Sequence, residues 1–162
     1  MTNSELTNNI NELECLAFSL FKIFAQYEYT IKEMGYLKNK KNNANAEPNW
    51  DKFVKDHGNK LIEEKNGNEV LHEAIKYIIN NPPSKQLVSS GKLIWVSQKP
   101  YKLNAHNLFT NIRLIRNNLY HGGKFSSDWF EPQRSKELIS SALVVLSRFK
   151  EITPEIKAHI DG

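Results

Sequence analysis

The sequence predicts an all-α protein, in which residues 1–162 form a single domain built as a bundle of four or five helices. Apolar residues recur at spacings of three and four over several long segments, the periodicity of helices that bury one face. Segments with the alternating pattern of strands are almost absent. A chain of 162 residues is also long enough to bury one hydrophobic core.

The first predicted helix is long and runs from Asn11 to Leu37. Its apolar stripe consists of Leu13, Leu16, Leu20, Phe24, Tyr27, Ile31 and Met34. Further apolar residues widen this stripe, so we expect the helix to contact neighbours on two sides; they are Phe18, Phe21, Ile23 and Ala25. Residues 38–49 are polar and without periodicity, which predicts a linker between the first and second helices.

The middle of the chain predicts two further helices. Asn49 is a suitable N-cap for a second helix beginning at Trp50, whose course between Gly58 and Glu64 the pattern does not define. Asn68 caps a third helix, which Pro82 and Pro83 must stop. Its apolar residues are Val70, Leu71, Ala74, Ile75, Ile78 and Ile79. Residues 90–100 are expected to form an extended, strand-like connector.

The last third of the chain predicts two more long helices. The fourth opens at Asn104 and runs to about His121, with a buried stripe of Leu108, Ile112, Ile115 and Leu119. Gly122 and Gly123 supply the left-handed conformation that commonly ends a helix. Pro132 stands in the first turn of the final long helix, and Thr153–Pro154 begins a short terminal turn. The apolar residues of that helix are Leu138, Ile139, Ala142, Val145, Leu146 and Phe149.

Composition excludes several classes of protein. No apolar run approaches the roughly 20 residues that a membrane helix needs, and the polar, acidic N-terminus is unlike a secretory signal, so we expect a cytoplasmic protein without membrane partners. Cys15 is the only cysteine, which excludes an intrachain disulfide and a thiolate metal cluster. With 22 Lys and Arg against 18 Asp and Glu, the net charge of +4 is compatible with a polyanionic partner without requiring one.

The segment with the most chemical information is NIRLIRNNLYHGGKF, residues 111–125. Arg113, Asn117 and His121 are four positions apart and share one helical face, so the amide can orient the imidazole. Arg116 and His121 point about 140° apart on an ideal helix. The two can meet only if the last turn unwinds, which the following glycines favour.

A fixed cation beside a titratable imidazole suits the cleavage of RNA by attack of its own 2′-hydroxyl. His121 can donate or accept a proton near neutral pH, and Arg116 can stabilise the charge that develops on the phosphate. No carboxylate cluster suits magnesium, so we expect neither a metal nor another cofactor. Acid and base act on opposite sides of phosphorus, yet one chain offers one such histidine. A homodimer with a composite site would supply both.

The string RNNLYHGGK resembles the R-x4-6-H motif of HEPN ribonucleases, including the polar residue directly after the arginine, here Asn117. FAQYEYTIKEMGY, residues 24–36, is similar to the opening helix of small prokaryotic members. The resemblance implies a HEPN-like helical bundle with catalytic Arg116 and His121, supported by Asn117 and, more loosely, by Glu28 positioning the arginine. It also implies a dimer and a toxin–antitoxin or anti-phage role, with a cognate antitoxin or defence-system protein as a further partner.

Other residues of the motif are assigned supporting roles. Arg113 precedes Arg116 by three residues, Tyr120 directly precedes His121, and Lys124 directly follows the motif, where it can contact an RNA phosphate. Gly123 stands where some HEPN toxins carry a tyrosine that is nucleotidylated, which argues against that mode of control.

Two alternatives remain open at this level. His121 can be read as a cation at a helix C-terminus and Arg116 as an ordinary surface ion pair. The chain would then be a HEPN-like module that binds RNA, a nucleotide or a partner protein without cleaving it.

Overall fold

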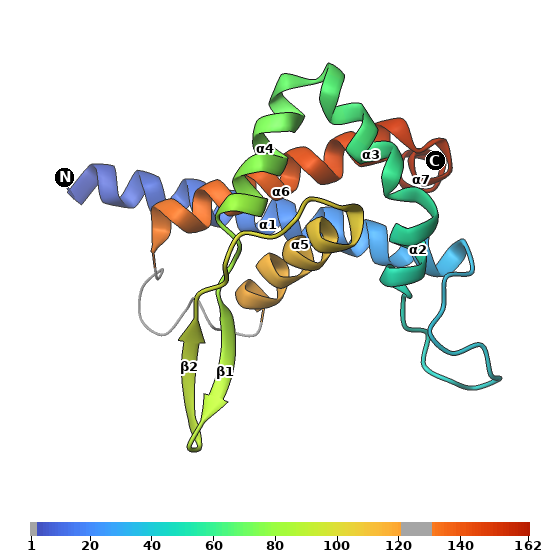
Figure 1. Ribbon diagram of the computed structural model, residues 1–162, viewed down its shortest axis with the longest axis horizontal. Coiled ribbons are helices and arrows are strands. Elements are labelled where there is room, and N and C mark those ends of the chain that lie inside the picture. Colours follow the sequence, from blue (N-terminus) through green and yellow to red (C-terminus); the bar gives the residue numbers. More distant parts are fainter. Residues whose placement is uncertain (1–2, 121–130) are drawn as a thin grey trace.

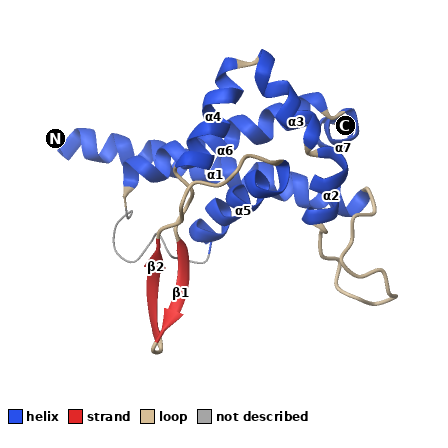
Figure 2. Ribbon diagram, in the orientation of Figure 1, coloured by secondary structure: helices blue, strands red, loops and turns tan. Residues whose placement is uncertain are grey.

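The fold is mostly helical, with one small two-stranded sheet (Figures 1 and 2). The computed structural model describes residues 3–120 and 131–162, with side chains described from residue 11 onward. In order, these residues form α1 (Asn3–Glu33), α2 (Trp50–His57), α3 (Asn59–Glu64), the 3-10 turn η1 (Lys65–Gly67), α4 (Glu69–Asn80), β1 (Lys85–Ser89), β2 (Lys92–Val96), α5 (Ala105–Tyr120), α6 (Pro132–Ile152) and α7 (Pro154–Asp161). The prediction of a predominantly helical chain is confirmed, whereas the predicted number of four or five helices is too small.

Helix α1 is long, as predicted, but it ends before Leu37. Gly35 adopts a left-handed conformation, with φ of +81°, and the amide of Tyr36 donates to the carbonyl of Ile31 at 3.0 Å. This pattern terminates helices because it satisfies their last carbonyls. No helix lies within residues 38–49, in agreement with the predicted linker.

The core lies where α1 and α6 run alongside each other and where α4 and α5 cover them (Figure 1). Tyr27 of α1 is fully buried, and its hydroxyl donates to the carbonyl of Leu146 in α6 at 2.6 Å. Trp50, Phe53 and Phe149 surround it in one aromatic cluster. The apolar residues predicted to be buried in the final long helix are all buried.

Three asparagine caps fix the beginnings of helices. The side chain of Asn49 accepts from the amide of Lys52 at 3.1 Å, and that of Asn68 accepts from the amide of Leu71 at 2.9 Å. Asn104 caps α5 in the same way through the amide of Asn107. These contacts satisfy amides that have no partner within the helix, and they confirm the predicted starts.

Two helical breaks differ from the prediction. Gly58 separates α2 from α3, and a β-carbon built there would lie only 2.8 Å from the β-carbon of Ala105. The close approach of α5 therefore requires glycine at the point where the chain turns. The terminal turn expected at Thr153–Pro154 is instead the eight-residue helix α7, whose Ile156 is fully buried.

Residues 85–96 form a hairpin that the sequence predicted only in part. The expected extended connector contains β2, but its partner β1 was not predicted. The strands pair antiparallel, from Lys85 with Val96 to Ser89 with Lys92. Ser90 and Gly91 connect them with φ of +49° and +74°, the conformation of a type I′ turn. The hairpin projects away from the helices (Figure 2).

The described helices differ from membrane-spanning ones. None of those in residues 3–120 and 131–162 combines the length and apolar character needed to cross a bilayer.

Candidate active site around Arg116

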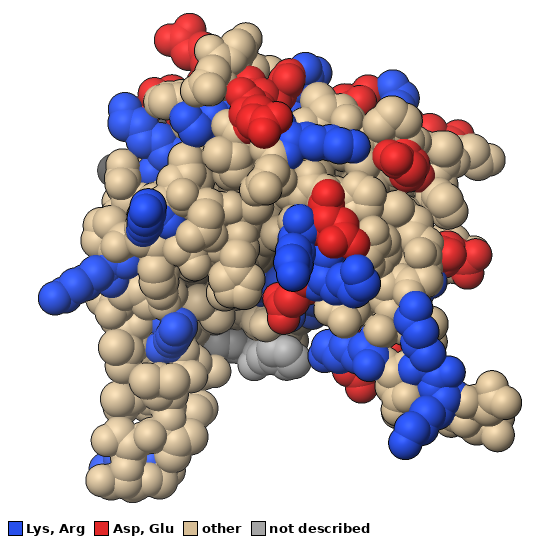
Figure 3. All heavy atoms as spheres, turned by 45° about the vertical axis from the view of Figure 1, so that its right-hand side comes forward, with Lys and Arg blue, Asp and Glu red and all other residues tan. Residues whose placement is uncertain are grey.

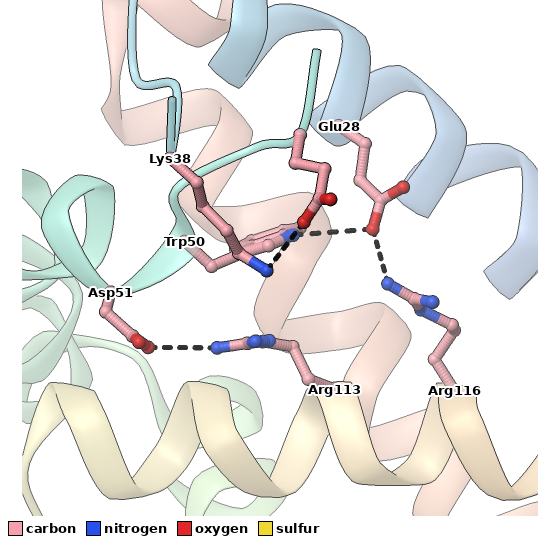
Figure 4. Close-up of polar contacts among 7 residues, drawn as sticks. Glu28, Lys38, Trp50, Asp51, Arg113 and Arg116 are labelled. Atoms are coloured by element: carbon pink, nitrogen blue, oxygen red, sulfur yellow. Dashed lines mark hydrogen bonds and ion pairs between the residues drawn. The ribbon is translucent and has the colours of Figure 1, made fainter. Parts of the chain in front are cut away.

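Helix α5 carries the arginines of the motif beside its buried stripe. Leu108, Ile112, Ile115 and Leu119 are all buried, as predicted, and fix the rotation of the helix about its axis. Arg113 and Arg116 consequently point toward the start of α2 and toward α1, respectively (Figure 4). The helical periodicity thus determines which surface receives the two guanidinium groups.

Arg116 is held by an acidic residue far away in the sequence. Its Nη2 donates to Oε1 of Glu28 in α1, and the indole of Trp50 donates to the same oxygen at 3.4 Å (Figure 4). The Arg116 and Glu28 side chains are 21% and 33% exposed, so the pair is shielded without being sealed from solvent. The structure therefore brings together Arg116 and Glu28, the residue expected to position it.

Aromatic rings enclose the other faces of this guanidinium. Its central carbon lies 5.1 Å from the centre of the Phe24 ring and 6.0 Å from that of Tyr120. Nε of Arg116 is buried and makes no hydrogen bond to the residues that the structure describes. The ion pair and the rings together hold the cation in one place, and a group in a fixed position can stabilise negative charge without reorganisation.

Arg113 has a different and more exposed partner. Its Nη1 lies 2.9 Å from Oδ1 of Asp51, at the start of α2 (Figure 4). The sequence reading missed Asp51, and only its place directly after the predicted cap Asn49 and Trp50 could have suggested it. Asn117 is half-buried and makes no side-chain hydrogen bond to another described residue.

Tyr120 ends α5 within a small apolar surface cluster. Its ring meets that of Phe21 edge-on at 5.7 Å, and Phe21 stacks on Phe18 at 6.2 Å. Phe18, Phe21 and Tyr120 are 67%, 51% and 41% exposed. Phe18 and Phe21 were expected to contact a second neighbour of α1, but no described residue covers them. Burial raises the pKa of Tyr120 to about 12, so its hydroxyl is neutral at physiological pH and cannot serve as a base there.

The remaining predicted site residues lie outside the described residues. These are His121, Gly122, Gly123 and Lys124. The expected unwinding of the last turn, and the distance from His121 to Arg116 and Asn117, therefore stay predictions.

Asn118 connects the motif helix to the hairpin, and the sequence reading missed it. It is 8% exposed, and its amide nitrogen donates to the carbonyl of Ser84 at 2.9 Å, directly before β1. A buried asparagine among apolar helix positions is a signal that could have drawn attention, because buried amides need partners.

In residues 3–120 and 131–162, no three His, Cys, Asp or Glu side chains gather as they would around a metal ion. Comparison of the chain with protein-family models, with curated proteins and with solved structures finds no match in any of the three. Function must therefore be argued from the residues themselves.

Proposed function

We propose that this protein is a metal-independent endoribonuclease of the HEPN type that acts as a homodimer in the cytoplasm. The observation that supports it best is the fixed position of Arg116, which is held by Glu28 and followed five residues later by His121; Glu28 in turn accepts from the indole of Trp50. An arginine anchored by its own carboxylate keeps its remaining N–H groups in defined directions, which suits recognition of a phosphate.

In this mechanism His121 transfers a proton and Arg116 stabilises charge. The 2′-hydroxyl of the RNA attacks the adjacent phosphorus as its proton leaves, and the bond to the 5′-oxygen breaks as that oxygen is protonated. The products are a 2′,3′-cyclic phosphate and a 5′-hydroxyl. DNA lacks the nucleophile and stays intact. Asn117 is proposed to orient the imidazole, and Lys124 to contact a neighbouring phosphate.

The apolar cluster of Phe18, Phe21 and Tyr120 supports the homodimer. Three large rings exposed side by side are typical of an interface, and Tyr120 directly precedes His121. A second copy covering this cluster about a two-fold axis would bring the two copies of His121 near each other. One histidine could then act as base and the other as acid on the same phosphate.

Cleavage is tested by incubating the protein with end-labelled single-stranded RNA in EDTA. We expect cyclic-phosphate ends, and loss of at least a hundredfold in rate for His121→Ala and for Arg116→Ala, about the contribution of a general acid–base group or a charge-stabilising donor. Intact RNA with the wild-type dimer would refute the nuclease proposal. Single-stranded DNA of the same sequence is the substrate control.

Dimerisation is tested separately by Phe18→Asp together with Phe21→Asp. We expect the dimer to become monomeric by light scattering, because like charges would meet across the two-fold axis. Val70→Asp is the matched control, since Val70 is 68% exposed on α4, outside the cluster. Unchanged mass in the α1 variant would contradict a dimer through this surface.

A second candidate function is a binding module without activity. The ion pair with Glu28 favours this function, because the Glu28 carboxylate competes with the scissile phosphate for the Arg116 guanidinium on which cleavage depends. Under this proposal the protein binds RNA, a nucleotide or a partner such as a cognate antitoxin or defence-system protein. Binding of RNA that persists without any product, in wild type and His121→Ala alike, would support this function over cleavage.

A further inference from the structure

The positive charge of this chain is concentrated in one stretch. From Ala74 to Tyr120 there are seven Lys and Arg residues and no Asp or Glu, whereas the rest of the chain has 15 Lys and Arg against 18 acidic residues. The acid-free stretch includes the hairpin and α5, the helix that carries Arg116. Such a charge asymmetry is typical of proteins that contact a polyanion.

Four lysines of this stretch belong to the hairpin and to the loop between β2 and α5. Lys85, Lys92, Lys99 and Lys102 are all exposed, and none of them forms an ion pair with a described residue. Lysines elsewhere do form such pairs, for example Lys38 with Glu47 and Lys150 with Asp161. In Figure 3 the projecting hairpin carries blue side chains and no red one.

The hairpin also exposes apolar side chains along its length. Val88 and Leu93 face each other near the tip and are 72% and 69% exposed, and Leu87 pairs with Ile94 on the other face. A two-stranded hairpin by itself is only marginally stable in water. Lysines alternating with uncovered apolar residues would suit a ligand that has both phosphates and exposed bases.

The base of the hairpin is hydrogen-bonded to the last turn of α5. Asn118, two residues after Arg116, donates to the carbonyl of Ser84, and Gln98 donates to the carbonyl of Pro83 at 2.6 Å. The first bond joins the start of the hairpin to the last turn of α5, and the second joins the segment after β2 to the segment before β1. Because the strands are short, the tip lies about 16 Å from the base, the span of two or three nucleotides.

We propose that the β1–β2 hairpin is an RNA-binding arm that holds unpaired RNA beside Arg116. Lys85 and Lys92 contact phosphates, and Leu87 and Ile94, which share their face of the hairpin and are 46% and 39% exposed, lie against unstacked bases. In duplex RNA the bases are stacked and paired, so an arm of this composition would gain only the phosphate contacts. This proposal specifies unpaired RNA as the substrate of the proposed nuclease, and it rests on that proposed function. Binding of RNA by the arm can nevertheless be measured without cleavage.

The test uses the full-length His121→Ala protein and three fluorescent probes of equal length: single-stranded RNA, duplex RNA and single-stranded DNA. We expect Lys85→Ala with Lys92→Ala to weaken binding of single-stranded RNA about tenfold at physiological salt. The slope of log Kd against log salt should fall by about 1.4, since each phosphate contact contributes about 0.7 for a single strand. Lys22→Ala with Lys60→Ala is the control, because both lysines are exposed, form no ion pair with a described residue and lie outside the acid-free stretch.

A second variant separates the contribution of the apolar side chains to RNA binding from that of the lysine charges. Leu87→Ser with Ile94→Ser keeps every lysine, and we expect it to reduce the preference for single-stranded over duplex RNA at least threefold. A third variant replaces residues 86–95 with Asn-Gly, which shortens the arm while keeping the Lys85–Val96 pair and the base. It should bind RNA as weakly as the lysine variant.

The outcomes distinguish this inference from the proposed function. Arm variants that bind RNA as tightly as the lysine control would overturn the arm, even if the wild-type protein cleaves RNA. Arm variants that become monomeric and show no loss of RNA affinity per chain would identify the hairpin as a protein contact, which also overturns it. Arm-dependent binding by a wild-type protein that never cleaves would refute the nuclease and leave the arm standing.

Discussion

Replacing Glu28 with glutamine would remove the charge that faces Arg116 while keeping nearly the same side-chain shape. The loss of a partner from an exposed pair costs less than about 1 kcal/mol, and from a fully buried pair about 3–5 kcal/mol. Glu28 and Arg116 are 33% and 21% exposed, between these limits. We therefore expect Glu28→Gln to lower the free energy of unfolding by about 2 kcal/mol, as the glutamine oxygen can still accept from Trp50.

The pairwise contribution can be isolated with a double-mutant cycle in urea. Glu28→Gln, Arg116→Gln and the double variant should give a coupling free energy of about 1–2 kcal/mol, because each single variant leaves a half-buried partner unpaired. Lys38 and Glu47 form the control cycle, since they are 57% and 58% exposed and should couple by less than about 0.5 kcal/mol. Equal coupling in the two cycles would refute the reasoning, because shielding from solvent would then have no effect.

Three further predictions concern stability. Asn68→Ala should lower the free energy of unfolding in urea by about 1 kcal/mol through loss of the α4 cap, and Asn68→Asp should not. Gly58→Ala should cost about 1–3 kcal/mol because its β-carbon would approach α5, whereas Gly67→Ala, with no atom within 4 Å, should cost nothing; equal effects would contradict the packing argument. Burial raises the pKa of Tyr77 and Tyr120 to about 12, so the folded state binds their protons more tightly than the unfolded state does. Stability should therefore fall as pH rises from 10 toward 12, and less steeply in Tyr77→Phe; the same pH profile in that variant would exclude this cause.

The sequence predicts helices well where local and tertiary signals agree. In α4, an asparagine cap, a spaced apolar stripe and two prolines mark both ends, and the structure has the helix at Glu69–Asn80. In α1 the stripe predicts the helix but not its end, because the left-handed glycine Gly35 competes with the apolar residues that follow it. Local signals thus locate an element more reliably than they locate its last residue.

The hairpin was harder to predict because it has no buried face. A strand is recognised by alternation between apolar and polar residues, and β1 and β2 expose apolar residues on both sides. The useful signal was the turn: Ser90–Gly91 stands between two runs of five residues that include β-branched and aromatic side chains.

The candidate site also has one part that local sequence patterns predict and another that depends on tertiary contacts. Spacing along one helix predicts the buried stripe of Leu108, Ile112, Ile115 and Leu119, and the structure confirms it. The partner Glu28 lies 88 residues away, so no local pattern could give the contact, and only the family resemblance suggested it. Trp50 begins a helix as predicted, but its hydrogen bond to Glu28 depends on tertiary packing alone.

The pairing of α1 with α6 has a consequence for synthesis of the protein. The ribosome makes α1 first, yet the helix that covers its apolar stripe is completed only at residue 152. A chain interrupted after α5 would carry Arg116 and Glu28 without the packing that brings their helices together. Truncated products should accordingly be unfolded and sensitive to proteases.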